Sequence, residues 1–450
     1  MKCEAVLLAA GQGTRMKSRL PKVLHTIAGL PMVDWSIEAC HQATGKKPFL
    51  VVGPASEELQ RKLEGKCDFI EQTDRLGTGH AVLQARQVLE GKTELVLVAH
   101  ADMPLLRAET FERLINRQIE NQGPVTILTA DAHESRGFGR IKRNGSGEIL
   151  GIIEELHATP EEQAIRELNV GAYVFRADWL WENLSGLPLS PKGEYYLTDM
   201  VSLAVEQDQR VESVSVTSSE EVIGVNTREH LAEAEQAMRM RINRRWMAEG
   251  VTLIDPATTY IGHDVQIGQD TVVLPNTHLE GTTSIGENCH IGSNSIIRNS
   301  VIGGGSRIES SVIEGATLEE DVEIGPFAHL REGAYLCRGV HMGNFGEVKN
   351  SRLEAGVKLG HFAYIGDAHI GENTNIGAGT ITCNFDGKNK HRTEIAADVF
   401  IGSDTMLVAP LKIGRGARTG AGSVVTKDVP EWSLAAGVPA RVIRKLDNHD

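Results

Sequence analysis

Two glycines and two basic residues near the N-terminus form a pattern suited to binding phosphate. Gly11 and Gly13 follow an apolar run, and Arg15 and Lys22 come shortly after them. Glycines let the backbone approach a ligand closely and turn its N–H groups toward anionic oxygens. The two cations can neutralise the charge that builds up when a nucleoside triphosphate undergoes substitution at phosphorus. This segment therefore predicts a nucleotide site.

The spacing of these residues disfavours two familiar nucleotide-binding classes. The segment Ala10-Gly11-Gln12-Gly13-Thr14-Arg15 fits neither G-x-x-x-x-G-K-[ST] nor G-x-G-x-x-G. A P-loop ATPase and a dinucleotide-dependent dehydrogenase are therefore disfavoured. The simpler alternative is a glycine turn with surface cations beside it.

His361 is the residue of the second half best suited to acid–base chemistry. Its imidazole titrates near neutral pH and can take a proton from a reacting group. The chain has 16 histidines, and we interpret others of this half, such as His263 and His278, as surface residues. His361 differs because Arg331 and Lys349 occur in the same stretch, and such cations suit a phosphate group.

The framework of the first half follows from apolar runs that alternate with amphipathic stretches. Strands are predicted over residues 4–9, 48–52, 95–99, 125–130 and 170–175. Helices are predicted over residues 32–43, 78–89, 109–122 and 197–207. This alternation predicts an α/β domain with a mostly parallel sheet, which binds ligands beyond the carboxyl ends of its strands.

The second half repeats an aliphatic residue every six positions, clearly so from Ile261 to Ile297 and in further blocks as far as Ile413. A hexapeptide period predicts a parallel β-helix, in which each repeat buries its face against its neighbours. With three hexapeptides per turn, residues 261–425 would form roughly nine coils. The period slips between residues 382 and 394, where we predict an extruded loop, a frequent place for binding.

Glycine usage and a long charged segment mark the boundary between the halves. Residues 1–250 hold 20 of the 47 glycines, and the shorter stretch 251–450 holds 27. Apolar residues at helical spacing over 227–248 predict one long helix, with Gly250 just past its end. We therefore predict an N-terminal domain over 1–226, a linker helix over 227–250 and a C-terminal domain over 251–450.

Charge and composition limit the possible partners. Acidic residues exceed basic ones by 60 to 46, so the net charge of −14 disfavours non-specific binding to nucleic acid or an anionic membrane. No apolar run approaches the ~20 residues of a membrane span, and the N-terminus lacks the features of a signal peptide. The six cysteines form no C-x-x-C pair, which argues against a disulfide framework and a zinc site. We predict a soluble cytoplasmic protein.

The segment Leu8-Ala9-Ala10-Gly11-Gln12-Gly13-Thr14-Arg15-Met16, with Pro21-Lys22 after it, resembles the signature of sugar-1-phosphate nucleotidylyltransferases. Joined to a hexapeptide β-helix, nearly the whole chain resembles a bifunctional family. Its members are N-acetylglucosamine-1-phosphate uridylyltransferases and also glucosamine-1-phosphate acetyltransferases. The resemblance implies acetylation of glucosamine 1-phosphate by acetyl-CoA, followed by coupling of the product to UTP with release of pyrophosphate. It also implies a Rossmann-like N-terminal domain, a left-handed β-helix and a homotrimer with acetyl sites between parallel β-helices.

Carried over position by position, the resemblance implies a uridylyl-transfer site that needs no protein nucleophile. Arg15 and Lys22 would act on the triphosphate. Asp102 and Asn226 would hold Mg²⁺, since one carboxylate and one carbonyl oxygen suit octahedral coordination. The residues implied to bind UTP and N-acetylglucosamine 1-phosphate are Leu8, Ala10, Gly11, Gly13, Gln72, Gly77, Thr78, Gly139, Glu154, Asn169 and Asn226.

Some of these residues have a simpler interpretation. Glu154 adjoins Glu155 as a solvated acid pair would, and asparagines such as Asn169 commonly form turns. Two departures from the family pattern leave the choice between UTP and dTTP open. The usual Tyr-Gly-Asp here reads His100-Ala101-Asp102, and Arg75 stands where the family has glutamine.

The same resemblance implies an acetyl-transfer site. His361 would take a proton as the substrate amine attacks the thioester carbonyl, and Glu347 would orient it. The residues implied to bind glucosamine 1-phosphate are Arg331, Lys349, Tyr364 and Asn375. Those implied to bind acetyl-CoA are Ala378, Asn384, Phe385, Ser403, Ala421 and Arg441. Close packing at coil corners is the alternative for the alanines, and Phe385 replaces a tyrosine that is frequent in the family.

Two rival functions stay open. The first is a nucleotidylyltransferase, such as a glucose-1-phosphate adenylyltransferase, whose β-helix is only a scaffold. His361 and Lys349 argue against it, because a scaffold requires neither. The second is a non-catalytic sensor of sugar nucleotides, which would not require Arg15, Lys22 or Asp102.

Overall fold

The computed structural model describes residues 1–132 and 134–447. It divides into two compact units, Met1–Met238 and Arg239–Asp450. The division falls inside the long helix α9 (Arg228–Ala248). This helix confirms the single long helix predicted over residues 227–248.

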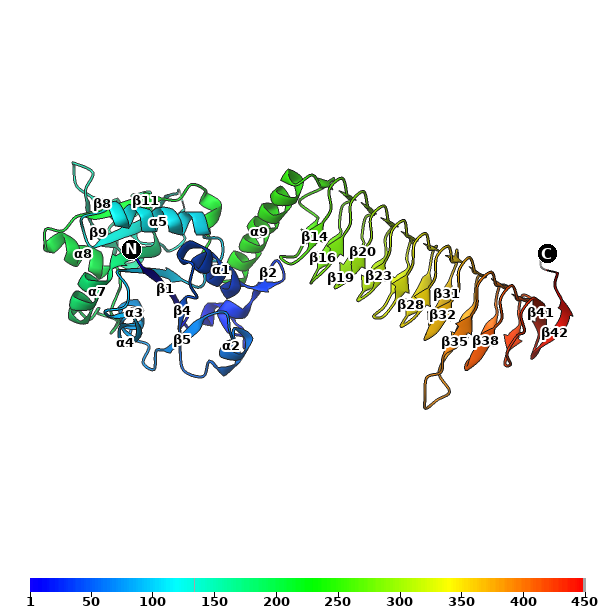
Figure 1. Ribbon diagram of the computed structural model, residues 1–450. Helices are drawn as coiled ribbons and strands as arrows, with labels where there is room; N and C mark the ends of the chain where they lie inside the picture. The colour runs from blue at the N-terminus through cyan, green and yellow to red at the C-terminus, as the bar shows by residue number, and fades with distance from the viewer. Residues whose placement is uncertain (133, 448–450) are drawn as a thin grey trace. The chain divides into compact units, whose positions relative to one another are not determined.

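Unit 1 is built on a mixed sheet whose main strand order is β11-β7-β10-β6-β1-β4-β5 (Figure 1). The neighbours β6 (Leu95–His100), β1 (Cys3–Leu8), β4 (Phe49–Val52) and β5 (Asp68–Glu71) are parallel. The long strand β10 (Glu167–Arg176) is antiparallel to β6 and to β7. On the other side of β10, β11 is parallel to β7, so β10 is the one strand of this order that runs against the others. The mostly parallel sheet predicted from the alternating pattern is therefore confirmed.

The predicted helices are found with small shifts in their ends. Residues 78–89 are the exception, because they form two short helices, α3 and α4. The chain tightens between them, where the N–H of Ala85 donates to Val82 O, three residues earlier. The helices of unit 1 are α1 (Met32–Thr44), α2 (Glu57–Lys62), α3 (Thr78–Leu83), α4 (Arg86–Leu89), α5 (Ala108–Glu120), α6 (Pro160–Gln163), α7 (Ala177–Asn183) and α8 (Asp199–Glu206). Its remaining strands are β2 (Thr26–Ile27), β3 (Leu30–Pro31), β7 (Val125–Asp131), β8 (Arg140–Arg143), β9 (Ile149–Ile153) and β11 (Val211–Ser215).

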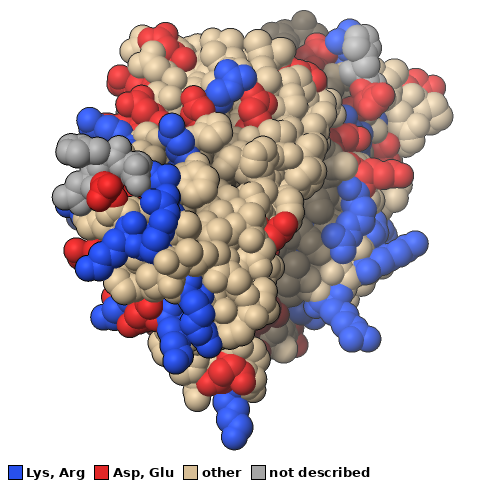
Figure 2. All heavy atoms as spheres, turned by 90° about the vertical axis from the view of Figure 1, so that its right-hand side faces the viewer, with Lys and Arg blue, Asp and Glu red and all other residues tan. Residues whose placement is uncertain are grey.

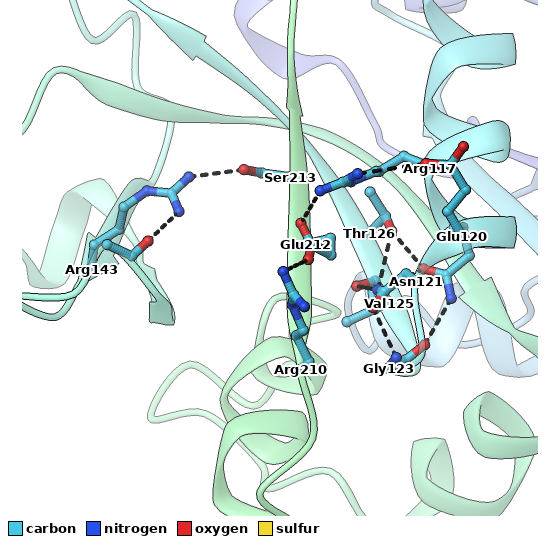
Figure 3. Close-up of polar contacts among 12 residues, drawn as sticks. Arg117, Glu120, Asn121, Gly123, Val125, Thr126, Arg143, Arg210, Glu212 and Ser213 are labelled. Carbon is cyan, nitrogen blue, oxygen red and sulfur yellow. Dashed lines mark hydrogen bonds and ion pairs between the residues drawn. The ribbon is translucent and has the colours of Figure 1, made fainter.

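The edge strand β11 is tied to its surroundings by ion pairs and hydrogen bonds (Figure 3). The Glu212 carboxylate lies 2.9 Å from Arg117 on α5 and 2.5 Å from Arg210. The Ser213 hydroxyl accepts a hydrogen bond of 2.8 Å from Arg143 on β8. Because β11 is at the edge of the sheet, it pairs with one strand only. The side chains of Glu212 and Ser213 add contacts that hold this edge strand to α5 and β8.

Unit 2 is a left-handed parallel β-helix of hexapeptide repeats, formed by three sheets of very short strands. Most of these strands turn one aliphatic side chain inward, such as Ile261, Leu279 and Ile297 in successive coils. In β34 and β39 the inward residue is a threonine, Thr382 and Thr419. The sheets contain twelve, ten and nine strands, in agreement with the roughly nine coils predicted. We name them the first, second and third sheets, in the order in which the chain enters them.

The first sheet contains β12 (Thr252–Leu253), β15 (Val272–Val273), β18 (His290–Ile291), β21 (Arg307–Ile308), β24 (Glu323–Ile324), β27 (His341–Met342), β30 (Lys358–Leu359), β33 (Asn375–Ile376), β36 (Phe400–Ile401), β39 (Arg418–Thr419), β41 (Ser433–Gly437) and β42 (Ala440–Lys445). The second contains β13 (Tyr260–Ile261), β16 (His278–Glu280), β19 (Ile296–Arg298), β22 (Val312–Glu314), β25 (His329–Leu330), β28 (Gly346–Lys349), β31 (Ala363–Gly366), β34 (Ile381–Cys383), β37 (Met406–Val408) and β40 (Val424–Val425). The third contains β14 (Gln266–Ile267), β17 (Ser284–Ile285), β20 (Val301–Ile302), β23 (Thr317–Leu318), β26 (Tyr335–Leu336), β29 (Arg352–Leu353), β32 (Ala368–Ile370), β35 (Thr393–Ile395) and β38 (Leu411–Ile413).

A loop leaves the coil between β34 and β35, where the hexapeptide period slips (Figure 1). The Asp386 carboxylate holds it by accepting hydrogen bonds from the backbone N–H groups of Lys388 and Asn389, at 2.8 and 2.7 Å. The ring of His391 lies 2.7 Å from the same carboxylate. The extruded loop predicted over residues 382–394 is therefore confirmed.

No helix of the described residues is long and apolar enough to cross a membrane. All six cysteines are free thiols, as their spacing predicted, and five of them are buried.

The inward aliphatic ladder should carry most of the stability of unit 2. Ile313 is fully buried on β22, so Ile313→Ala should lower the free energy of unfolding by about 2–5 kcal/mol. Val301 on β20 is half exposed, so Val301→Ala should cost no more than about 0.5 kcal/mol. Urea unfolding followed by circular dichroism measures both changes. Equal shifts of the two unfolding midpoints would contradict the claim that the inward aliphatic side chains carry most of the stability of unit 2.

Candidate functional site

A cavity of about 790 Å³ lies in unit 1 at the carboxyl ends of β1 and β6, where a parallel sheet places its ligands. Nearly all residues predicted for the nucleotide site line it. They are Leu8, Ala10, Gly11, Arg15, Lys22, Gln72, Gly77, Thr78, Asp102, Gly139, Glu154, Asn169 and Asn226. The structure places Gly13 behind Lys22 instead, where an added Cβ would lie 2.7 Å from Lys22 Cβ.

Two cations converge on the predicted metal ligands at one end of this cavity. Lys22 Nζ contacts the Asp102 carboxylate and donates to Asn226 Oδ1 at 3.2 Å. Arg15 Nη2 donates to the same amide oxygen at 3.0 Å. A carboxylate oxygen and an amide oxygen that both accept from one ammonium form a donor pair that fits Mg²⁺.

The charge state of this end follows from its contacts. Burial alone would raise the pKa of Asp102, but Lys22 and His100 outweigh it, so the pKa lies below its ordinary value. The carboxylate is therefore ionised at neutral pH and able to hold a cation. Burial lowers the pKa of His100, so its imidazole is neutral there.

The predicted sugar-binding residues are held by hydrogen bonds around a bulge in β10. Glu154 Oε1 accepts from the Thr198 hydroxyl at 2.8 Å. Asn169 is buried and donates to Tyr173 Oη at 2.7 Å. Glu154 and Asn169 are thus fixed cavity residues, and the interpretations as a solvated acid pair and a turn do not describe them.

The predicted uracil-binding residues lie in the loop between β5 and α3. Gln72 is buried, and its Nε2 donates to Gly77 O at 3.1 Å. Thr78 Oγ1 accepts from Leu197 N at 3.0 Å. Gln72, Gly77 and Thr78 therefore form one hydrogen-bonded wall of the cavity.

Sequence reasoning missed several residues of this cavity. Phe138, Tyr173, Tyr196 and Thr198 line it. The signal that could have found the last two is the polar and aromatic run Glu194-Tyr195-Tyr196-Leu197-Thr198, directly before α8.

In unit 2, His361 and three predicted acetyl-CoA contacts form one column. His361, Ala378, Ser403 and Ala421 all lie where the chain passes from the first to the second sheet, in four successive coils. We call this column the His361 corner. Backbone hydrogen bonds join its coils: Gly379 N donates to Phe362 O at 2.7 Å, Asp404 N to Ala378 O at 2.6 Å and Gly422 N to Ser403 O at 2.8 Å.

The outer face of the second sheet carries the predicted sugar-phosphate residues beside this corner. Glu347 pairs in register with Tyr364, one coil on. Arg331 Nη1 donates to Glu347 Oε1 at 2.8 Å, so the structure places Glu347 against an arginine. Among the residues that the structure describes, no carboxylate is paired with Lys349. This cation is therefore free to bind a phosphate.

Gly366 leaves room for the Tyr364 hydroxyl in this face. A Cβ on Gly366 would lie 2.5 Å from Tyr364 Oη and 2.7 Å from Asn384 Nδ2. Because Gly366 has no side chain, the Tyr364 hydroxyl and the Asn384 amide can both lie above it. Asn384 is held in turn by Asp367, whose Oδ2 accepts from its Nδ2 at 2.5 Å.

The remaining predicted residues lie apart from the His361 corner within one chain. Asn375 is on the first sheet, and Asn384 and Phe385 follow β34 at the passage to the third sheet. Arg441 lies on β42, opposite Ala436 of β41. Figure 2 shows the side of the structure that carries β41 and β42, where a broad area between the charged side chains is neither acidic nor basic.

Comparison with known families defines the class of each unit. Residues 5–247 match the MobA-like NTP transferase domain. Residues 264–299 match the bacterial transferase hexapeptide, and residues 282–325 and 393–427 match the hexapeptide repeat of succinyl-transferase. The chain is therefore a nucleotidyltransferase joined to a hexapeptide-repeat transferase.

Similar proteins narrow this class to a family. The chain is 47% identical over 445 residues to the bifunctional protein GlmU of Carboxydothermus hydrogenoformans, with 99% of each chain covered. It is 45% identical over 432 residues to that of an Exiguobacterium species, with 96% of each covered. It is also 45% identical over 435 residues to that of Geotalea uraniireducens, with 96% and 95% covered. The chain belongs to the GlmU family.

The space above Gly366 should matter for acetyl transfer. Gly366→Ala should displace the Tyr364 phenol and raise the KM for glucosamine 1-phosphate by on the order of tenfold, because misplaced contacts bind substrate poorly. Gly262→Ala is the matched control, since its Cβ would meet nothing closer than 3.5 Å. Steady-state acetyl-transfer assays measure both. An unchanged KM in Gly366→Ala would show that Tyr364 does not bind the sugar.

Proposed function

We propose that the two activities are divided between two separate sites, the cavity of unit 1 and the His361 corner of unit 2. The chain is a bifunctional enzyme that makes UDP-N-acetylglucosamine. It first transfers an acetyl group from acetyl-CoA to glucosamine 1-phosphate and then a uridylyl group from UTP to N-acetylglucosamine 1-phosphate. The exposed His361 and the partly exposed Lys349, which is paired with no carboxylate of the described residues, carry the proposal. A β-helix that served only as a scaffold requires neither.

In the uridylyl step, a phosphate oxygen of the sugar phosphate attacks the α-phosphorus of UTP. The new P–O bond forms as the bond to the β-phosphate breaks, and pyrophosphate leaves. Arg15 and Lys22 neutralise the triphosphate, and Gln72 with Gly77 and Thr78 binds the uracil. Catalysis is positioning and charge neutralisation, without a covalent intermediate on the protein.

Mg²⁺ is the metal that the donor set of this cavity suits. Asp102 and Asn226 would hold it, and when bound it supplies positive charge to the phosphate oxygens. Lys22, which contacts both Asp102 and Asn226, would then be available to the triphosphate.

In the acetyl step, the amine of glucosamine 1-phosphate attacks the thioester carbonyl of acetyl-CoA. His361 takes the amine proton, the C–N bond forms, and the C–S bond breaks to release CoA. Lys349 and Arg331 bind the sugar phosphate, with Glu347 holding Arg331 in place. The pantetheine arm lies along the small residues of the His361 corner, and Arg441 faces the phosphates of CoA.

The enzyme acts as a homotrimer. Within one chain, Asn384 and Phe385 lie across the second sheet from the His361 corner, so a second subunit would complete the acetyl-CoA site. The location is cytoplasmic, where UTP and acetyl-CoA are available and free thiols persist. We propose no nucleic-acid or membrane partner, because the net charge is −14.

The division of labour predicts that His361→Ala removes one activity only. Acetyl transfer should fall by at least about a hundredfold, because a general base contributes that much or more, while uridylyl transfer stays within about twofold. His341→Ala is the control, since this histidine lies on β27 and pairs with the surface residue Glu323. Separate assays of CoA and pyrophosphate release measure the two steps. Equal loss of both activities would refute two separate sites.

Asp102→Ala should give the reverse pattern. Pyrophosphate release should fall at least about a hundredfold, because the carboxylate that holds the cation is lost, and acetyl transfer should not change. Asp131→Ala, which removes an exposed acid paired with Arg166, is the matched control. A uridylyl rate like that of the unaltered protein would disprove the metal assignment.

A further inference from the structure

Arg75 occupies the nucleotide side of the cavity, and the reaction described above does not use it. It lines the cavity from the loop between β5 and α3. Its Nε donates a hydrogen bond of 3.0 Å to the carbonyl oxygen of Ala10. Ala10 begins the glycine loop, and Gln72 and Gly77 flank Arg75 in sequence. One side chain therefore bridges the two loops that hold UTP.

The guanidinium of Arg75 packs against the backbone of Gly53. Gly53 follows β4 and is buried. A Cβ there would lie 2.7 Å from Arg75 Nη2, 3.1 Å from Nε and 3.2 Å from Ala10 O. The planar group thus lies against bare backbone, which fixes its direction.

The charge of Arg75 is not balanced by an acid. At the metal end, Lys22 contacts Asp102 and Arg15 donates to Asn226. Arg75, by contrast, forms no ion pair with any acid in residues 1–132 or 134–447, and Ala10 O occupies only its Nε–H. Its side chain is exposed to the solvent of the cavity. The Nη groups carry four of the five N–H donors of an arginine, and the side chain that bears them lines the cavity.

We propose that Arg75 binds a phosphate group of UTP through its Nη groups, as a third cation of the nucleotide site. This inference rests on the proposed uridylyl-transfer function of the cavity. An arginine fork matches phosphate oxygens with two parallel N–H···O bonds, and the Ala10 contact holds the fork ready without consuming those donors.

Calorimetry with the full-length protein and Mg²⁺ tests the phosphate contact, with UTP and uridine as the two ligands. Arg75→Gln should weaken UTP binding about tenfold, as expected when a charged contact is lost, and leave uridine binding unchanged. The UTP affinity of Arg75→Lys should lie between those of the unaltered protein and Arg75→Gln, because lysine keeps the charge but lacks the two parallel N–H donors of arginine. Arg86→Gln is the matched control, since Arg86 is paired with Glu90 on α4 outside the cavity.

A second variant tests the packing of Arg75 against Gly53, and it keeps the inference testable if Arg75→Gln does not fold. Gly53→Ala should push the guanidinium away and weaken UTP binding in the natural background, but add nothing to Arg75→Gln. Equal loss of UTP and uridine affinity in Arg75→Gln, or unchanged UTP affinity, would overturn the inference. A Gly53→Ala effect that persists in Arg75→Gln would overturn it too. If the unaltered protein binds no UTP, the proposed function itself fails.

Discussion

The hexapeptide period is the constraint on which unit 2 depends. One aliphatic side chain in six must point inward, and each coil buries it only against the coils above and below. That requirement keeps the backbone of successive coils in register, as the pairing of Ile261 with Leu279 shows. Outward residues of successive coils are then stacked in columns, whatever their chemistry. The proposed acetyl site consists of such columns, with His361 at a corner and Lys349 and Tyr364 on the adjoining sheet.

In unit 1, the site residues are positioned by contacts between cationic side chains and the oxygens at the carboxyl end of the sheet. β1 and β6 deliver the glycine loop and Asp102 to the same edge, because parallel strands end together. Lys22 and Arg15 then share the oxygens of Asp102 and Asn226. Arg75 lies on the opposite loop against Gly53. Three cations therefore line the cavity, two on the side of the glycine loop and one on the loop between β5 and α3.

Much of this architecture could be predicted from the sequence, and the failures have physical causes. The six-residue period predicted the β-helix because inward side chains repeat with it. The mostly parallel sheet of unit 1 was also predicted, but periodicity carries no information about strand direction and so could not identify β10 as the strand that runs against its neighbours. The predicted helix over 78–89 was wrong because apolar spacing continues through the tight turn at Ala85.

The candidate sites show the same limit. The column of His361, Ala378, Ser403 and Ala421 is hidden in the sequence, where successive members lie 17, 25 and 18 residues apart. The middle interval is longer because the extruded loop interrupts that coil, and only the structure shows that the corner is kept. Tyr196 and Thr198 reach the cavity through the fold around α8, and the polar and aromatic run before that helix is the local signal that they leave in the sequence.

The most direct measurement follows the products of the full-length protein with time by mass spectrometry. The reaction mixture contains glucosamine 1-phosphate, acetyl-CoA, UTP and Mg²⁺. We predict that N-acetylglucosamine 1-phosphate appears first and that UDP-N-acetylglucosamine then accumulates, together with CoA and pyrophosphate. A UDP-sugar that carries no acetyl group, with acetyl-CoA unconsumed, would contradict the account and leave unit 2 without a catalytic role.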